Sequence, residues 1–294
     1  MNRRNFIRTG LAGLAVVGSG VISKGCTQGE NPLAIDKVKL GNTGLTVPRI
    51  AMGTGTAGYG KSSNQTRSGQ ENFTKLVRHA YEKGVSFYDM ADNYGSHTFV
   101  REALKGLPRE KVTLLTKVFI HEDGSEHNEP LKKILDRFRI ETGSDYFDIL
   151  LIHYMTQGGW AEVRKQSTEE FSEAKREGIV KTVGVSCHNI DALAEAAVNP
   201  WVDVIMARLN PFGTNMDGSP EDVVAILETA KNNGKGIIGM KIFGEGKHVT
   251  DPERQQSLEF AINEGNVHCM TIGFEAESQI DDAVERVMKI VKAG

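Results

Sequence analysis

The sequence is poor in the features that mark specialised classes of protein. Aromatic residues make up only 7% of its 294 residues, there are three cysteines, and no apolar run reaches the roughly 20 residues that span a bilayer. Neither sign of charge dominates, since 35 Lys and Arg face 38 Asp and Glu. The 39% of hydrophobic and 25% of charged residues are ordinary globular proportions, which exclude collagen-like, coiled-coil and wholly disordered chains. Because a basic stripe is also missing, we expect no nucleic-acid partner.

The placement of cysteine and histidine argues against a metal site. Cys187 and Cys269 lie inside apolar runs, where a thiol is more often inert core than half of a disulfide. His97 is expected at the surface near the start of a helix, and none of the histidines has metal-ligand spacing with a carboxylate or a cysteine. We therefore expect no metal.

Residues 1–25 are typical of a targeting segment, and they resemble a twin-arginine (Tat) export signal. Arg3 and Arg4 precede an apolar run over residues 11–23, and small residues follow it. The resemblance implies that the Tat translocase exports the folded protein to the periplasm or cell envelope. Cys26 is then a candidate lipid anchor, the one membrane contact expected. The alternative is an arginine-rich amino-terminal helix, and residues 26–36 are a short linker.

Residues 37–294 alternate short apolar runs with longer amphipathic stretches, which predicts parallel βαβ units. The eight runs cover residues 49–53, 86–89, 112–117, 148–152, 180–186, 202–208, 236–240 and 268–272. Helical patterns between them include residues 70–82, 130–142, 191–198, 220–232 and 279–291. Eight units predict a single (β/α)8 TIM barrel. A doubly wound sheet is the alternative, but no Gly-x-Gly-x-x-Gly follows an early strand.

Ionisable residues stand where consecutive strands are expected to end. Asp89, Lys117 and His153 end the second, third and fourth runs, and Tyr94 follows Asp89 by five residues. The carboxyl ends of barrel strands meet at one mouth, where active sites of this fold lie. These four side chains are therefore the candidate catalytic group.

The motifs around these residues resemble those of the aldo-keto reductases. They are Phe87-Tyr88-Asp89-Met90-Ala91-Asp92-Asn93-Tyr94-Gly95, Leu115-Thr116-Lys117 and Leu150-Leu151-Ile152-His153. The segment 40–48 is similar to the N-terminal β-hairpin that plugs the barrel bottom in that family. The resemblance implies a catalytic tetrad of Asp89, Tyr94, Lys117 and His153, with NADP or NAD as cofactor and a small carbonyl or sugar substrate.

The chemistry of carbonyl reduction explains why these residue types occur together. A hydride goes to carbon and a proton to oxygen, but a free tyrosine, with a pKa near 10, is a weak acid at neutral pH. The Lys117 cation would lower the pKa of Tyr94, and Asp89 would hold Lys117 in place. His153 would hydrogen-bond the substrate oxygen. Tyr94 is then the general acid in reduction and the general base in oxidation.

The resemblance also assigns a nucleotide-binding half to the later strands. The residues expected to bind the nucleotide are Gly55, Thr56, Ser186, Cys187, Met206, Met240, Lys241, Phe243, Gly244, Gly246, Gly273, Phe274 and Gln279. Cys187, Met206 and Met240 replace polar or aromatic residues that usually contact the nicotinamide. Backbone amides at Gly244 and Gly246 could approach the pyrophosphate. The segment 272–279 lacks the cations that clasp the 2′-phosphate of NADP, so we expect a weakened NADP preference.

Two other functions stay open at this point, together with the nature of the substrate pocket. A non-catalytic envelope binding protein would explain the altered nucleotide contacts, although it has no need of a tetrad. A barrel hydrolase would need paired acids at strand ends, and only Asp89 clearly ends a strand. Tyr154 and Trp160 are candidates for an aromatic wall around the substrate, or they pack beneath their own loops. An exported reductase would also need a tightly held nucleotide that it recycles between two substrates.

Overall fold

The computed structural model describes residues 35–120 and 129–294. The predicted export signal, Cys26 and residues 121–128 lie outside the described residues. In the described part of the chain, no helix combines the length and apolarity that a membrane crossing requires.

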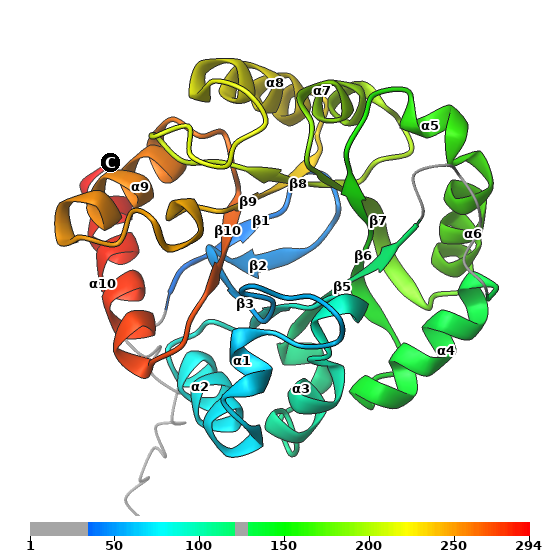
Figure 1. Ribbon diagram of the computed structural model, residues 1–294, viewed down its shortest axis with the longest axis horizontal. Helices are drawn as coiled ribbons and strands as arrows, with labels where there is room; N and C mark the ends of the chain where they lie inside the picture. The colour runs from blue at the N-terminus through cyan, green and yellow to red at the C-terminus, as the bar shows by residue number, and fades with distance from the viewer. Residues whose placement is uncertain (1–34, 121–128) are drawn as a thin grey trace, which may run out of the picture. The chain divides into compact units, whose positions relative to one another are not determined.

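Eight parallel strands close into a barrel, which Figure 1 shows end-on. In the order around the barrel, β10 lies between β9 and β3, and the other strands follow in sequence. The strands are β3 (Ile50–Gly53), β4 (Phe87–Asp89), β5 (Thr113–Phe119), β6 (Phe147–Met155), β7 (Val180–Cys187), β8 (Val204–Arg208), β9 (Gly236–Met240) and β10 (Cys269–Gly273). Each matches one predicted apolar run, so the (β/α)8 barrel is confirmed.

Helices surround the barrel and occupy the amphipathic stretches of the sequence (Figure 1). They are α1 (Asn64–Arg67), α2 (Gln70–Glu82), α3 (His97–Ala103), α4 (Leu131–Thr142), α5 (Trp160–Val163), α6 (Lys165–Arg176), α7 (Ile190–Val198), α8 (Pro220–Asn232), α9 (Asp251–Asn263) and α10 (Glu277–Ala293). Short 3-10 turns add η1 (Asp92–Tyr94), η2 (Arg109–Lys111) and η3 (Gly244–Gly246). All five predicted helical segments are helices.

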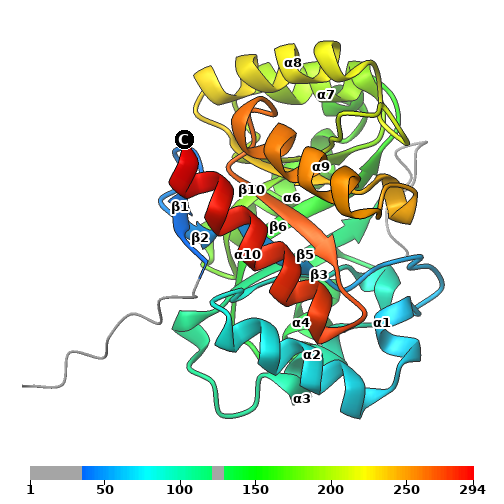
Figure 2. The ribbon, with the colours of Figure 1, turned by 90° about the vertical axis from the view of Figure 1, so that its left-hand side faces the viewer.

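An antiparallel hairpin, β1 (Lys37–Lys39) with β2 (Thr46–Pro48), closes the amino-terminal end of the barrel. Leu40 and Val47 are fully buried and join the apolar cluster inside the barrel. Leu40 lies so close to the start of β9 that a Cβ on Gly236 would come within 2.7 Å of it. Figure 2 shows the hairpin at the end of the barrel opposite the loop that follows β3. The predicted plug is therefore confirmed.

The barrel has two apolar cores, one inside the strands and one between strands and helices. Side chains alternate along a strand, so Phe87, Leu115 and Leu151 point into the barrel and contribute to the inner core. The next inward positions on the same strands are Asp89, Lys117 and His153. The apolar filling thus supports a polar layer at the carboxyl ends of the strands.

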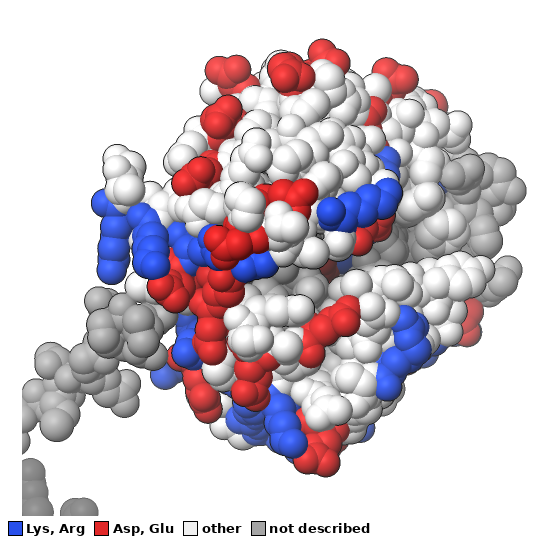
Figure 3. All heavy atoms as spheres, turned by 60° about the vertical axis from the view of Figure 1, so that its left-hand side comes forward, with Lys and Arg blue, Asp and Glu red and all other residues white. Residues whose placement is uncertain are grey.

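The outer surface carries both signs of charge close together. On the face that brings α9 and α10 forward, Figure 3 shows acidic and basic side chains interspersed. Here Arg254 and Arg286 both pair with Asp251 and Asp282, which ties the two helices together. Exposed pairs of this kind contribute little each, about 0–1 kcal/mol. This face therefore offers no patch of one sign for a charged partner.

Candidate active site

A buried ion pair lies at the centre of the mouth. The Lys117 ammonium donates to the Asp89 carboxylate and, at 3.1 Å, to the carbonyl of Met90. The other Asp89 oxygen accepts the Thr271 hydroxyl at 3.0 Å. Burial disfavours the charged form of Lys117, but Asp89 and Tyr94 together outweigh burial and raise the pKa of the ammonium. Lys117 is therefore a fixed cation, with only 1% of its side chain exposed.

Tyr94 lies directly over this cation. It ends the 3-10 turn η1, and the Lys117 Nζ is 4.9 Å from the centre of its ring. Its hydroxyl is 3.5 Å from Nε2 of His153. Two glycines leave room for the ring, because a Cβ on Gly55 would come within 2.3 Å of it and one on Gly58 within 2.6 Å. The four predicted catalytic side chains thus come together.

The net shift of the tyrosine differs from the expectation. Burial raises the pKa of Tyr94 above its ordinary value, and the nearby Lys117 opposes that rise without reversing it. The expected sign of the lysine effect is right, but the expected net lowering of the Tyr94 pKa is wrong. Tyr94 therefore holds its proton at neutral pH.

His153 is neutral for two reasons. Burial and the cations Lys117 and Lys241 hold the pKa of its imidazole well below the usual range. His153 belongs to strand β6, which runs on to Met155. The pairing of β6 with β7 shifts register between Ile152 and Met155. A neutral imidazole can donate one hydrogen bond and accept another, which suits contact with both Tyr94 and a substrate oxygen.

The register shift in β6 also turns an aromatic side chain outward. Tyr154 has φ +71°, a backbone conformation that bulky residues rarely adopt, and it is 44% exposed. Its ring lies 4.3 Å from the ring of His188. Trp160, the other candidate for an aromatic wall, is 2% exposed and donates to the Ala192 carbonyl at 3.2 Å. Of the two, only Tyr154 reaches the mouth.

The predicted nucleotide contacts of β7 and β8 lie together on the other side of the mouth. The Ser186 hydroxyl accepts the backbone N–H of Tyr154 at 2.9 Å. Cys187 is fully buried, and burial raises the pKa of its thiol, so it is inert. Met206 and Met240 belong to the inner apolar core. Neither methionine supplies the hydrogen bonds that a nicotinamide carboxamide requires.

Two backbone amides of the glycine turn after β9 are hydrogen-bonded within the turn itself. Gly244 N–H donates to the carbonyl of Lys241 at 2.8 Å, and Gly246 N–H donates to that of Phe243 at 3.0 Å. These two amides are thus engaged, contrary to the expectation that they face a pyrophosphate. The Lys241 ammonium pairs with Glu245 on the same turn.

The predicted nucleotide contacts after β10 contribute to packing and to a turn. They are Gly273, Phe274 and Gln279. A Cβ on Gly273 would come within 2.0 Å of the Thr56 hydroxyl oxygen, so this glycine permits a close approach of two loops. Phe274 is 1% exposed, and Gln279 accepts the Glu275 amide at 2.8 Å. The side chains of Phe274 and Gln279 are therefore already occupied.

The turn after β9 nevertheless has two features that suit an anionic nucleotide. Gly246 has φ +85°, and space is open where its Cβ would be, so a ligand can approach bare backbone there. Lys241 holds an ammonium group beside this turn, where it can exchange Glu245 for a phosphate. The residues that would hold the nucleotide are thus Lys241 and the turn over η3.

Sequence reasoning missed a buried cluster beside Ser186. Arg208, at the end of β8, donates to Asp217 and, at 3.0 Å, to the carbonyl of His188. Burial, with the nearby cations Arg208 and Lys241, lowers the pKa of His188 to about 3. Arg208 was visible as a polar strand end, but the pattern gave no sign of Asp217, which lies in a long loop with its side chain 1% exposed.

His97 also departs from the expectation of a surface residue. It is 3% exposed, because it begins α3 directly against β5 and α4. Its nitrogens contact Glu141 and Thr116. Histidine at the first position of an amphipathic helix gives no sequence signal of this burial.

The comparisons with known proteins assign the family. The sequence profile of the Aldo/keto reductase family matches residues 49–292, which is most of the barrel. The chain belongs to the aldo/keto reductase family. Members of this family are NAD(P)-dependent oxidoreductases, so the enzyme class and the NADP or NAD cofactor are confirmed. A non-catalytic binding protein is not favoured.

Individual relatives of this aldo/keto reductase are distant. It is 23% identical to an L-galactose dehydrogenase of Arabidopsis thaliana, over 87% of this chain and 89% of that protein. It is 25% identical to an NADH-specific methylglyoxal reductase of Escherichia coli, over 67% of this chain and 64% of that one. An aldo-keto reductase of Klebsiella pneumoniae, solved in complex with NADPH, superposes with a TM-score of 0.65 at 17% identity over 86% of this chain and 90% of that one. At that identity the likeness shows the fold alone.

Proposed function

We propose that the protein interconverts a carbonyl compound and an alcohol, with Tyr94 as the general acid and base. The observation that carries this proposal is the position of the Tyr94 ring, 4.9 Å from the buried Lys117 ammonium, with its hydroxyl 3.5 Å from His153. A bound nicotinamide supplies or accepts the hydride. A protonated tyrosine beside a fixed cation can give its proton to a substrate oxygen, because the cation stabilises the negative charge left on the tyrosine.

Each neighbour of Tyr94 has a separate task in this proposal. Lys117 stabilises the tyrosinate that forms when the proton leaves, and Asp89 holds the ammonium in place. His153, neutral and buried, orients the substrate oxygen toward Tyr94. The low accessibility of this group keeps water from weakening the charge interactions.

The substrate class is the least constrained part of the proposal. We propose small aldehydes, ketones or sugars, supported by the names of the two relatives above, a dehydrogenase of L-galactose and a reductase of methylglyoxal, and by the exposed ring of Tyr154 at the mouth. The direct test is the consumption of NADH and NADPH by the purified protein with a panel of such carbonyl compounds. Turnover with at least one of them is expected. Absence of turnover across aldehydes, ketones and sugars, with both nucleotides bound, would refute the activity.

The residues after β10 support a weakened preference for NADP over NAD. Glu275 lies in this segment, and its carboxylate accepts Asn64 at 2.6 Å without a cation in the pair. A carboxylate here repels the added phosphate of NADP. We expect the affinity for NADP to exceed that for NAD by less than tenfold.

Export and a captive nucleotide form a separate proposal, which rests on the amino-terminal segment alone. Arg3 and Arg4 before an uncharged run support transport of the folded protein by the Tat translocase to the periplasm or cell envelope, and Cys26 would then anchor it. Such an enzyme needs a nucleotide that it carries along and recycles. The test is to purify the exported protein without added nucleotide, release bound small molecules with acid, and identify them by mass spectrometry. Stoichiometric NAD(H) or NADP(H) is expected, and an empty protein would overturn the captive nucleotide.

A further inference from the structure

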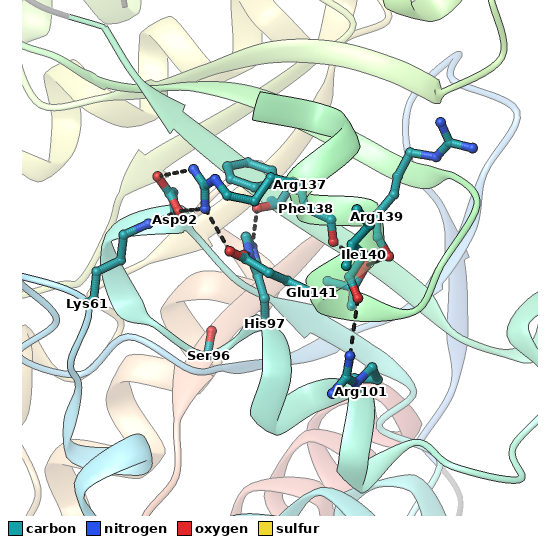
Figure 4. Close-up of polar contacts among 12 residues, drawn as sticks. Lys61, Asp92, Ser96, His97, Arg101, Arg137, Phe138, Arg139, Ile140 and Glu141 are labelled. Atoms are coloured by element: carbon teal, nitrogen blue, oxygen red, sulfur yellow. Dashed lines mark hydrogen bonds and ion pairs between the residues drawn. The ribbon is translucent and has the colours of Figure 1, made fainter. Parts of the chain in front are cut away.

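A charged cluster lies beneath the turn that carries Tyr94. Asp92 begins this turn, His97 begins the helix after it, and both face Glu141 on α4 (Figure 4). Lys61 and Arg137 complete the cluster, which borders a pocket of about 520 Å³. None of these five residues belongs to the tetrad.

Arg137 joins α4 to the Tyr94 turn through a two-pronged ion pair. Its Nη1 and Nη2 donate to the two Asp92 oxygens at 2.9 and 3.0 Å, and Nη1 also donates to Glu141 at 2.9 Å. Burial disfavours the charge on Asp92, but the hydrogen bonds from Arg137 and Lys61 outweigh it and lower the pKa of the carboxyl. Planar guanidinium groups favour this geometry because both donors meet both acceptors.

His97 extends the same cluster to the strand that carries Lys117. Its Nδ1 lies 2.8 Å from Glu141, and its Nε2 lies 2.9 Å from the hydroxyl of Thr116, the residue before Lys117. The ring also packs edge-on against Phe138 at 4.5 Å. Helix α4 is therefore linked to the Tyr94 turn by Arg137 and to β5 by His97.

Asp92, His97 and Glu141 have the side chains of a metal site, and their ligand atoms lie within 4.8 Å of one another. Yet both oxygens of each carboxylate and both His97 nitrogens already have protein partners, among them Arg137 and Lys61. A divalent cation would have to displace two positive charges. The cluster is thus balanced by its own side chains and is better explained as a structural link.

We propose that Arg137 and His97 are positioning residues that set Tyr94 against Lys117. This inference rests on the proposed function. Asp92 and Tyr94 share one tight turn, since Gly95 N–H donates to the Asp92 carbonyl and Tyr94 N–H to that of Ala91. A shift of Asp92 therefore moves the tyrosine, whereas the chemistry tolerates misplacement by only a fraction of an ångström.

The first test replaces Arg137 and compares the kinetic constants. Arg137→Met should lower kcat at least tenfold while the Kd for the nucleotide changes less than twofold, because the nucleotide side of the mouth is untouched. Arg137→Lys, which keeps the charge, should recover part of the loss. The control is Arg286→Met, which removes ion pairs with Asp282 on α10 and Asp251 on α9, far from the turn. A kcat for Arg137→Met no lower than that of the control would overturn the proposal.

A second set of variants keeps the test valid if Arg137→Met does not fold. Asp92→Asn preserves shape and should lower kcat by a similar factor. Thr116→Val removes the hydroxyl that meets His97 at constant volume and should lower kcat by a smaller factor, again with an unchanged Kd. If wild type reduces carbonyls and both variants keep its kcat, the positioning role is wrong and the function stands. If wild type itself has no activity, the proposed function fails first.

Discussion

On the β4–β6 side of the mouth, the Lys117 ammonium contacts both Asp89 and the ring of Tyr94, and His153 meets the tyrosine hydroxyl. On the β7–β10 side, Lys241 pairs with its own turn, and Met206 is packed in the inner core. The side chains of the catalytic side are thus in contact with one another. The nucleotide side has to exchange protein partners for ligand, so the two sides should respond differently to substitution.

The largest expected effect on stability comes from Lys117, on the catalytic side. Lys117→Met leaves Asp89 buried without its cation, which should cost about 3–5 kcal/mol of unfolding free energy and lower kcat by a factor of about 10² or more. The double variant Asp89→Asn/Lys117→Met should regain most of the stability but none of the activity. Thermal unfolding and single-turnover kinetics measure the two effects. Recovery of activity in the double variant would contradict the role of Lys117.

The next effect tests the glycine cradle of Tyr94. Gly55→Ala places a methyl group within 2.3 Å of the ring, so the ring must move, and kcat should fall by about 10-fold or more. Gly60→Ala is the control in the same loop, because it meets only backbone strain (φ +59°) and no neighbouring atom. It should cost about 1 kcal/mol of stability and leave kcat nearly unchanged. Equal losses in both variants would show that loop strain, and not contact with Tyr94, matters.

On the nucleotide side, a smaller change is expected from Met206. Met206→Gln buries an amide without a partner in the nucleotide-free protein, which costs about 1–3 kcal/mol. A bound carboxamide would pair with it, so the thermal shift on adding nucleotide should be larger than in wild type. Met206→Leu, which adds no polar group, should leave that shift unchanged. If the glutamine variant gains nothing from nucleotide, the carboxamide does not lie at this position.

The ratio of NADP affinity to NAD affinity should respond more weakly still to substitution. Glu275→Lys should tighten NADP relative to NAD by about two- to fivefold, since exposed charge pairs are worth about 0.2–1 kcal/mol. Glu285→Lys, farther along α10, should leave the ratio unchanged. Titration of both nucleotides by fluorescence measures it. A wild-type preference for NADP of tenfold or more would contradict the assignment of this segment.

The rate of reduction should depend very little on pH over a wide range. Burial raises the pKa of Tyr94 above about 10, so the tyrosine keeps the proton it must donate and loses it only in alkali. His153 has its pKa lowered below about 6.5, so it gains charge only in acid. The rate of the chemical step should therefore be flat between these limits and fall at high pH. A fall centred near pH 7 would mean that another group controls the reaction.

The same contrast explains how much could be predicted from sequence. The eight strands and Asp89, Lys117 and His153 follow from apolar runs that end in ionisable residues, because alternation along a strand fixes which side chains face inward. The positions on the nucleotide side follow much less directly. The turn over η3 is held by backbone hydrogen bonds, and the Ser186 hydroxyl accepts a backbone N–H. Neither kind of contact can be predicted from the pattern of residue types.

Burial by distant elements was the other limit. His97 follows a loop and begins a helix, so its sequence surroundings are polar, yet α4 and β5 cover it. The outward turn of Tyr154 depends on a register shift in β6 that a continuous apolar run does not reveal. Asp217 meets Arg208 only through the path of the loop after β8. Each of these features arises from tertiary packing and not from local preference.

The most direct measurement of the central claim compares wild type with Tyr94→Phe in a single turnover. Each protein is saturated with NADH and mixed rapidly with an aldehyde that wild type reduces, and the loss of nicotinamide absorbance is followed. The variant should bind NADH with an unchanged Kd and transfer hydride at least about 10³-fold more slowly, since only the proton donor is lost. Hydride transfer at nearly the wild-type rate would contradict Tyr94 as the general acid.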